Sequence, residues 1–154
     1  MAKALVADTS AAAGRAAAHL LERLGFRVAC AEVADEAMAL IAGTRPELVL
    51  ADCRIETAGG RGLIETIRRQ GWGGDICLFH VTADGSPSSI RRALDAGADD
   101  YIVKPYDEAL LRFKLMQART RGRLDTGRPR LRVVQDNSST GDTSWRFRVY
   151  GRTA

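Results

Sequence analysis

The stretch ALDAGADDYIVKPY, residues 93–106, decides how the chain folds. It begins in the last turns of a helix that Gly97 closes, since glycine commonly ends helices. It then enters the short apolar run 101–103, which is typical of a strand, and this strand gives way at once to Lys104 and Pro105. A helix that leads into an apolar strand, with a charged residue at the strand's carboxyl end, is one unit of an alternating α/β fold.

The same alternation extends back to the N-terminus. Apolar runs typical of strands lie at 3–8, 26–31, 47–51, 75–81 and 101–103, and helix-forming segments follow them at 11–25, 34–43, 62–71, 86–97 and 107–124. The strands are continuous apolar runs, as expected where helices cover both faces of a parallel sheet. The pattern predicts an α/β fold: a (βα)5 doubly wound parallel sheet, flavodoxin-like, with strand order 2-1-3-4-5.

Composition agrees with a globular domain that has a real core. The chain has 154 residues, of which 45% are hydrophobic. No apolar run approaches the ~20 residues that a membrane-spanning helix needs, and residues 1–10 lack the apolar region of a secretory signal. Cys30, Cys53 and Cys77 lie far apart in apolar stretches, which favours reduced thiols over a disulfide framework or a zinc site. We therefore expect a cytoplasmic protein that does not enter a membrane.

Residues 125–154 follow another pattern. The segment 125–130 resembles a linker, and the alternating runs LRVVQD and SWRFRVYG flank a polar loop, which predicts a β-hairpin. From Arg119 to Ala154 nine arginines stand against three aspartates, so this end carries +6 and residues 1–118 carry −2 of the total net charge of +4. The expected organisation is one domain at 1–124 and a basic linker with a hairpin tail at 125–154.

Four predicted strands are followed by, or end in, a polar side chain. These residues are Asp8, Asp52, Thr82 and Lys104. In an open α/β sheet the carboxyl ends of parallel strands share one edge, and ligands bind there at the point where the strand order reverses. Each residue alone is common as a helix cap or a surface group. Together, with Asp8 facing Asp52 across the reversal, they predict a binding or reactive site.

The motifs LVAD, LVLAD, HVTA and ALDAGADDYIVKPY resemble the receiver domain of response regulators, the CheY-like family of two-component signalling. The resemblance covers about residues 1–120. It implies a switch in which Asp52 accepts a phosphoryl group from a histidine kinase or a phosphotransfer protein. Such a domain is not an enzyme for an external substrate, because its chemistry is confined to phosphorylation and dephosphorylation of its own aspartate.

The resemblance also implies a magnesium site and a set of switch residues. Asp8, Asp52 and the backbone carbonyl of Arg54 would hold Mg²⁺, which prefers oxygen ligands. The hydroxyl of Thr82 would turn toward the phosphoryl group and Lys104 would pair with it. Pro105 matches the proline that follows this lysine, and Tyr101 matches the aromatic residue whose rotamer reports the active state.

The sequence departs from the family at three places. Thr9 stands where a second acid is usual. It can be a poor ligand that leaves Mg²⁺ weakly bound, it can cap the next helix, as Ser10 also could, or it can do both. The loop RIETAGGRG after Asp52 lacks the usual proline and is longer. In it, Arg54 faces Asp84 from an adjacent loop, where the two could form a pair that screens the site or remain solvated.

Two hypotheses of different classes follow. The first is the phosphorylation-controlled switch. The second is a pseudo-receiver, an interaction module that no longer depends on phosphate, which Thr9 and the altered loop favour. The hairpin could pair with a second copy to form a homodimer, or begin an output domain. Nucleic-acid binding by this chain alone is disfavoured because the tail has no recognition helix.

Overall fold

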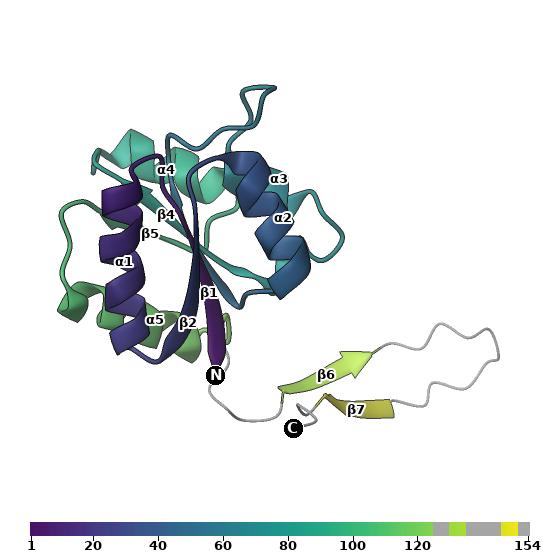
Figure 1. Cartoon of the computed structure of the whole chain (residues 1–154). Coiled ribbons are helices and arrows are strands. Elements are labelled where there is room, and N and C mark those ends of the chain that lie inside the picture. The colour runs from purple at the N-terminus through teal and green to yellow at the C-terminus, as the bar shows by residue number, and fades with distance from the viewer. Residues whose placement is uncertain (125–129, 135–145, 151–154) are drawn as a thin grey trace. The chain divides into compact units, whose positions relative to one another are not determined.

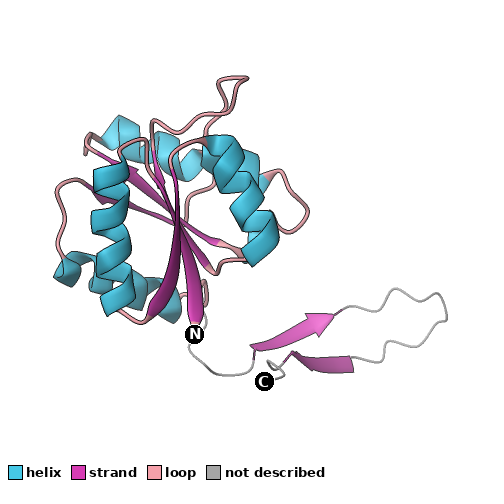
Figure 2. Cartoon of the chain, in the orientation of Figure 1, coloured by secondary structure: helices cyan, strands magenta, loops and turns pink. Residues whose placement is uncertain are grey.

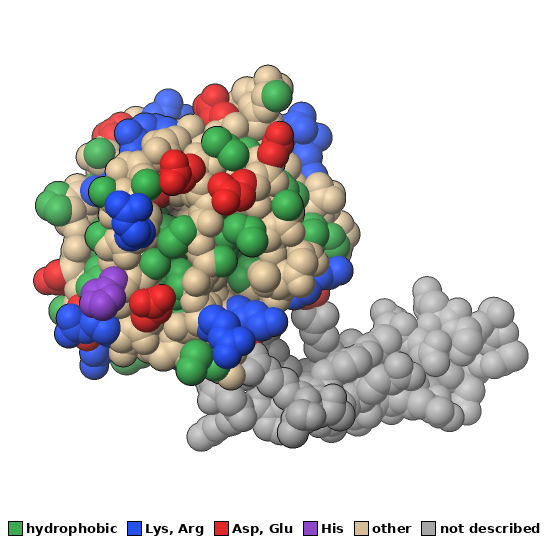
Figure 3. Space-filling view, viewed as in Figure 1, with side chains coloured by type: hydrophobic (Ala, Val, Ile, Leu, Met, Phe, Trp, Pro, Cys, Tyr) green, Lys and Arg blue, Asp and Glu red, His purple; other side chains and the backbone are tan. Residues whose placement is uncertain are grey.

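The structure, a computed structural model, describes residues 1–124, 130–134 and 146–150. The chain divides into two compact units, Met1–Leu124 and Asp125–Ala154, and each is described by itself. In the first unit strands and helices alternate along the chain (Figure 1). Its surface carries charged side chains of both signs interspersed with hydrophobic ones on the face shown in Figure 3.

Five strands form the sheet of the first unit. They are β1 (Ala2–Ala7), β2 (Phe26–Ala31), β3 (Leu48–Asp52), β4 (Cys77–Thr82) and β5 (Asp100–Val103). Their order is β2-β1-β3-β4-β5, and every neighbouring pair is parallel, so the predicted sheet is confirmed. Because Ala7 lies opposite Ala51 in the β1–β3 register, Asp8 comes beside Asp52 where the strand order reverses.

Helices cover both faces of this sheet. They are α1 (Ala11–Arg23), α2 (Ala34–Thr44), α3 (Leu63–Arg68), α4 (Pro87–Asp95) and α5 (Glu108–Thr120). Side chains of α1 and α5 pack with one hydrophobic cluster, and those of α2, α3 and α4 pack with the other. The sheet therefore lies between two helical layers (Figures 1 and 2).

The central strand shows why the apolar runs are continuous. All five residues of β3 are buried. Leu48 and Leu50 belong to the cluster under α1 and α5, and Val49 and Ala51 belong to the cluster on the opposite face. Successive side chains of a strand point to opposite faces, so a strand covered on both sides is apolar along its length, and β3 is apolar up to Asp52 at its carboxyl end. Full burial of each large side chain contributes about 1.5–3 kcal/mol.

Helices α1, α4 and α5 each begin at a residue whose side chain caps the first turn. The side chains of Ser10, Ser86 and Asp107 each accept a hydrogen bond from the backbone N–H three residues further on. Such caps satisfy backbone donors that have no partner inside the helix. Ser10, rather than Thr9, therefore caps α1.

Four helices end earlier than predicted, and the difference is largest for α3 and α5. Helix α3 stops at Arg68 because the chain turns into a short 3-10 helix, η1 (Gly73–Asp75). A Cβ on Gly73 would lie 1.9 Å from the carbonyl oxygen of Ile67, so only glycine permits this close return. Helix α5 stops at Thr120, and Gly122 follows with a φ of 73°. Beyond it the side chain of Leu124 is buried in the core.

Asp99 organises the edge of the sheet opposite the strand ends described above. Its carboxylate accepts hydrogen bonds from Arg68 at 2.8 Å, from Arg123 at 2.7 Å and from the backbone N–H of Leu78 at 2.8 Å. The two guanidinium groups also donate to backbone carbonyls, including that of Ile76. This cluster ties α3, the start of β4 and the end of α5 to one carboxylate.

The second unit contains the predicted hairpin strands. Strand β6 (Arg130–Val134) pairs antiparallel with β7 (Arg146–Tyr150), with Leu131 opposite Val149 and Val133 opposite Phe147. The predicted linker and loop lie outside the described residues. No helix of the described part of the chain is long and apolar enough to cross a membrane.

Candidate functional site

The four polar strand ends converge as the sequence predicts. Asp8 follows β1, Asp52 ends β3, Thr82 ends β4 and Lys104 follows β5. Three of these side chains are buried although they are polar: Asp8 is 5% exposed, Asp52 4% and Thr82 2%. Burying a polar group costs free energy unless it is hydrogen-bonded, so the arrangement depends on the contacts described next.

Lys104 joins the two carboxylates. Its Nζ lies 2.7 Å from Oδ2 of Asp8 and 2.6 Å from Oδ2 of Asp52. Partial burial alone would lower the pKa of Lys104, but the hydrogen bonds to Asp52 and Asp8 outweigh it and raise the pKa. The ammonium therefore stays charged and holds two carboxylates together that would otherwise repel each other. The peptide between Lys104 and Pro105 is cis.

Arg54 contacts the same two carboxylates as Lys104. Its backbone N–H donates to Oδ1 of Asp52 at 2.8 Å, its Nε donates to Oδ1 at 3.0 Å and its Nη2 donates to Oδ2 at 3.2 Å. The same Nη2 lies 3.7 Å from Oδ1 of Asp8. Burial would raise the pKa of Asp52, but the hydrogen bonds from Arg54 and Lys104 prevail and hold this pKa well below the usual range. Asp52 is therefore ionised at neutral pH.

The proposed Arg54–Asp84 pair does not form. Arg54 pairs instead with Asp52 and Asp8, which are buried and closer to it. Asp84 is used within its own loop, where Oδ1 accepts the backbone N–H of Ser86 at 2.9 Å ahead of α4. The backbone N–H of Asp84 in turn donates to the hydroxyl of Thr82 at 3.0 Å. Asp84 therefore stabilises its own loop and does not form an ion pair with Arg54 that would screen the site.

Thr9 lies at the rim of the site with an exposed side chain. Its neighbour Ser10 donates its backbone N–H to Oδ1 of Asp8 at 2.8 Å, which fixes the orientation of that carboxylate. Gly14 of α1 approaches the same side chain, since a Cβ on it would lie 3.7 Å from Cβ of Asp8. Ser10 and the first turn of α1 therefore help to fix the position of the Asp8 side chain.

Tyr101 has a partner that sequence reasoning missed. The Nζ of Lys114, on α5, lies 4.3 Å from the centroid of the Tyr101 ring. The same Nζ donates to Oδ1 of Asp100 at 2.8 Å. The half-buried ring is thus held on α5 by a cation–π contact. The only sequence signal was a lysine on a helix that packs beside β5, which does not distinguish this contact from a solvated side chain.

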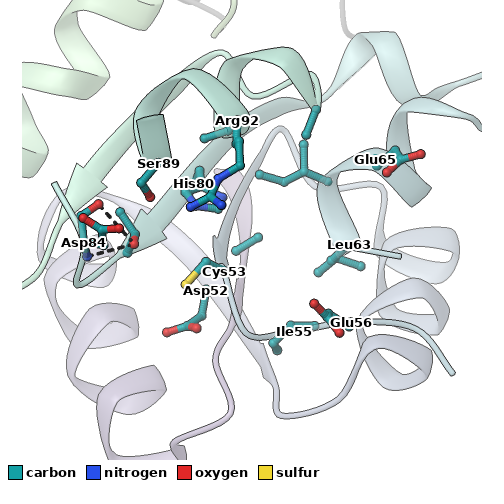
Figure 4. A pocket seen from close by; sticks show the side chains of 16 residues that line it. Asp52, Cys53, Ile55, Glu56, Leu63, Glu65, His80, Asp84, Ser89 and Arg92 are labelled. Carbon is teal, nitrogen blue, oxygen red and sulfur yellow. Dashed lines mark hydrogen bonds between the residues drawn. The ribbon is translucent and has the colours of Figure 1, made fainter. Parts of the chain in front are cut away.

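A cavity of about 430 Å³ opens beside Asp52, between the loop after β3 and helix α4. Cys53, Ile55 and Glu56 line it from the loop, and His80 and Arg92 lie together on the other side (Figure 4). Burial lowers the pKa of His80, although the charge of Asp52 opposes this, so the imidazole is neutral at pH 7. The cavity gives a small molecule or a moving side chain access to the neighbourhood of the carboxylate.

The carboxylate oxygens of Asp8 and Asp52 are donor atoms that could hold a divalent cation. A single ammonium contacts both Oδ2 atoms of Asp8 and Asp52, so one small hard cation can also share these oxygens. In the described part of the chain, however, no group of three or more His, Cys, Asp or Glu residues is placed to hold a metal. Two positive side chains already balance the two carboxylates.

A doubly wound sheet with two buried carboxylates, a hydroxyl and a lysine at its strand ends is the architecture of a receiver-type signalling domain. The family model of the response regulator receiver domain matches residues 4–116. This match covers most of the chain, which therefore belongs to the response regulator receiver family.

Curated relatives point to the same family. The phosphate regulon transcriptional regulatory protein PhoB of Pseudomonas aeruginosa is 32% identical over 118 residues, which are 75% of this chain and 52% of PhoB. The response regulator MprA of a Mycobacterium species is 34% identical over 118 residues, which are 75% of this chain and 50% of MprA. The chain thus spans about half the length of these relatives.

Solved structures share the fold. A response regulator from Desulfuromonas acetoxidans superposes with a TM-score of 0.71 at 20% identity, over 78% of this chain and 98% of that one. The chemotaxis protein CheY4 of Vibrio cholerae superposes with a TM-score of 0.69 at 25% identity, over 76% of this chain and 98% of that one.

Proposed function

We propose that the chain is a phosphorylation-controlled signalling switch in which Asp52 accepts a phosphoryl group from a histidine kinase or a phosphotransfer protein. The observation that carries this proposal is the setting of Asp52. Its carboxylate is buried and ionised at the end of the central strand, with the ammonium of Lys104 2.6 Å away. An ionised oxygen is the nucleophile that phosphoryl transfer requires, and fixed positive groups compensate charge on the transferred group.

The transfer balances with groups that the donor and the site supply. An oxygen of Asp52 attacks phosphorus and forms the new P–O bond. The bond from phosphorus to the donor breaks, and its electron pair leaves with the imidazole of a phosphohistidine or with the carboxylate of an acyl phosphate. Lys104 is placed to pair with the phosphoryl oxygens, because its Nζ already contacts Oδ2 of Asp52. Hydrolysis later returns free Asp52 and inorganic phosphate, so we propose no external substrate and no enzymatic role beyond this cycle.

Mg²⁺ is the cofactor we propose, bound weakly. Asp8 and Asp52 would hold it together with the backbone carbonyl of Arg54. When bound, it would neutralise negative charge on the phosphoryl oxygens. Thr9 contributes no carboxylate, which is why we propose weak binding.

The switch itself would involve Thr82 and Tyr101. In the present structure the hydroxyl of Thr82 accepts the N–H of Asp84, on the loop that leads into α4. A phosphoryl group on Asp52 offers this hydroxyl strong acceptor oxygens. If Thr82 turns to donate to them, the Asp84 amide loses its acceptor and the loop must rearrange. Tyr101 lies on the adjacent strand, since its neighbour Ile102 is opposite Val81, and its ring would respond to that movement.

A pseudo-receiver that works without phosphate is the second candidate. The observation that favours it is Arg54, because it hydrogen-bonds both oxygens of Asp52 and so covers the nucleophile. The output also stays a proposal, because the chain spans only about half of its curated relatives. We propose that the hairpin expected at residues 128–151 mediates self-association as a homodimer, since twofold dimers are the commonest oligomers.

The two candidates separate by intact mass after incubation with acetyl phosphate and Mg²⁺. The switch predicts that the full chain gains one phosphoryl group and that Asp52→Asn gains none. Asp84→Asn is the matched control, because it removes a carboxylate of a neighbouring loop and should be phosphorylated like the wild type. No mass gain in the wild type would favour the pseudo-receiver.

A further inference from the structure

Arg54 contacts both buried carboxylates of the site and reaches them from the solvent side. From this geometry we infer that Arg54 is a displaceable counter-cation, which occupies the carboxylate pair in the resting protein and competes with a divalent cation for it. The inference rests on the proposed function for its biological meaning, but its physical content concerns the unphosphorylated protein. It adds a regulatory role for a side chain whose predicted partner was a different residue.

The charges of the site balance without a metal ion. Asp8 and Asp52 contribute two negative charges, and Lys104 and Arg54 contribute two positive ones at hydrogen-bonding or ion-pairing distance. A divalent cation added to this neutral set would leave a net charge of +2 beside buried oxygens. If Arg54 moves away, the same cation leaves +1. Since like charges at short range repel even in a partly solvated site, binding of the cation and withdrawal of Arg54 are coupled.

Arg54 and a divalent cation would also compete for the same carboxylate oxygens of Asp52. Arg54 donates to Oδ1 of Asp52 through Nε and to Oδ2 through Nη2. Lys104 donates to Oδ2 of the same carboxylate. Both oxygens of Asp52 are therefore engaged by positive groups, and a cation that ligates either one must displace a donor or share the oxygen with it.

Arg54 and Lys104 differ in how firmly each is held at the carboxylates. The side chain of Lys104 is 25% exposed, and its Nζ contacts both carboxylates at 2.7 Å or less. The side chain of Arg54 is 60% exposed, and its contacts are longer. Exposed ion pairs are worth little because water and salt screen them. Arg54 is consequently the cation that leaves, and Lys104 stays with the carboxylates.

The test is a Mg²⁺ titration of the unphosphorylated 154-residue chain at constant ionic strength, followed by backbone amide shifts in NMR spectra. Three variants are compared with the wild type: Arg54→Ala, Arg54→Lys and Arg69→Ala. Arg69 is a matched control, since its side chain is 59% exposed and pairs with a glutamate on α3 rather than with the site. Thermal unfolding of each variant establishes that it folds.

We expect Arg54→Ala to bind Mg²⁺ roughly two- to fivefold more tightly than the wild type, as removal of a weakly held competing ion pair predicts. Arg54→Lys keeps the positive charge, so its affinity for Mg²⁺ should lie between those of the wild type and Arg54→Ala. The affinity of Arg69→Ala should equal that of the wild type. Unchanged or weaker binding by Arg54→Ala would overturn the inference. An equal gain in Arg69→Ala would also overturn it, because the effect would then follow net charge alone.

The phosphorylation assay keeps this result separate from the proposed function. If the wild type accepts no phosphoryl group while Arg54→Ala binds Mg²⁺ more tightly, the switch fails and the competition stands. If the wild type is phosphorylated at Asp52 while Arg54→Ala shows no gain in affinity, the competition fails and the switch stands.

Discussion

Replacing Lys104 by methionine should destabilise the fold and change how its stability depends on pH. Methionine keeps much of the apolar stem and removes the ammonium that joins Asp8 and Asp52. Loss of one partner from a buried ion pair typically costs 3–5 kcal/mol. Lys104 is 25% exposed and Arg54 remains nearby, so we expect a loss of about 2 kcal/mol at pH 7.

The sign of the pH dependence follows from Asp52. The pKa of Asp52 in the folded protein lies below 3.8, the ordinary value for an aspartate. Its ionised form therefore contributes stability above pH 3.8, and this contribution is lost as the pH falls below that value. Without Lys104 the folded-state pKa rises toward or above the ordinary value, and the variant has less stability to lose on acidification. The difference between wild type and Lys104→Met should therefore shrink by about 1 kcal/mol between pH 7 and pH 3.

Urea unfolding followed by circular dichroism at both pH values measures this difference. Lys3→Met is the control, because Lys3 is exposed and its Nζ donates to the backbone carbonyl of Thr44, away from the site. In a double-mutant cycle with Asp52→Asn, the two changes should couple by about 1 kcal/mol or more. A loss below about 0.5 kcal/mol at pH 7, or one that is equal at both pH values, would refute the assigned role of the ammonium.

Three further predictions concern other parts of the chain. Asp99→Ala should lower the free energy of unfolding by about 3 kcal/mol, because it leaves two partly buried guanidinium groups without their carboxylate; a loss under about 1 kcal/mol in urea unfolding would contradict this. Thr9→Asp should tighten Mg²⁺ binding by restoring a carboxylate at the rim of the site, and an unchanged titration would show that residue 9 does not reach the metal. Truncation after Leu124 should give a folded monomer in sedimentation velocity, while the full chain should sediment as a dimer. If both chains sediment as monomers, self-association through the hairpin is excluded.

The fold was predictable because its signals are local and repeated. Each strand is a continuous apolar run, α1, α4 and α5 begin at a residue whose side chain caps them, and the parallel order brings the strand ends to one edge. The proximity of Asp8, Asp52 and Lys104 followed from topology alone, without knowledge of any side-chain conformation. Helix ends were less predictable, because α3 stops where Gly73 packs against the backbone of Ile67, a contact with no local signature.

The partners of long charged side chains were not predictable. Arg54 can reach several carboxylates, and its position in the sequence does not say which is nearest once the loop has folded. The structure shows it on Asp52 and Asp8, whereas sequence reasoning considered Asp84. The contact of Lys114 with the ring of Tyr101 was missed for the same reason, because it depends on how α5 packs beside β5.

Hydrogen–deuterium exchange of the full chain, with and without acetyl phosphate and Mg²⁺, tests most directly whether phosphorylation operates a switch. We expect altered amide protection across residues 82–106, which contain the Thr82–Asp84 contact, α4 and Tyr101. The change should be absent in Asp52→Asn under the same conditions. A wild-type chain that carries one phosphoryl group, confirmed by intact mass, and yet shows unchanged exchange in this segment would contradict the account.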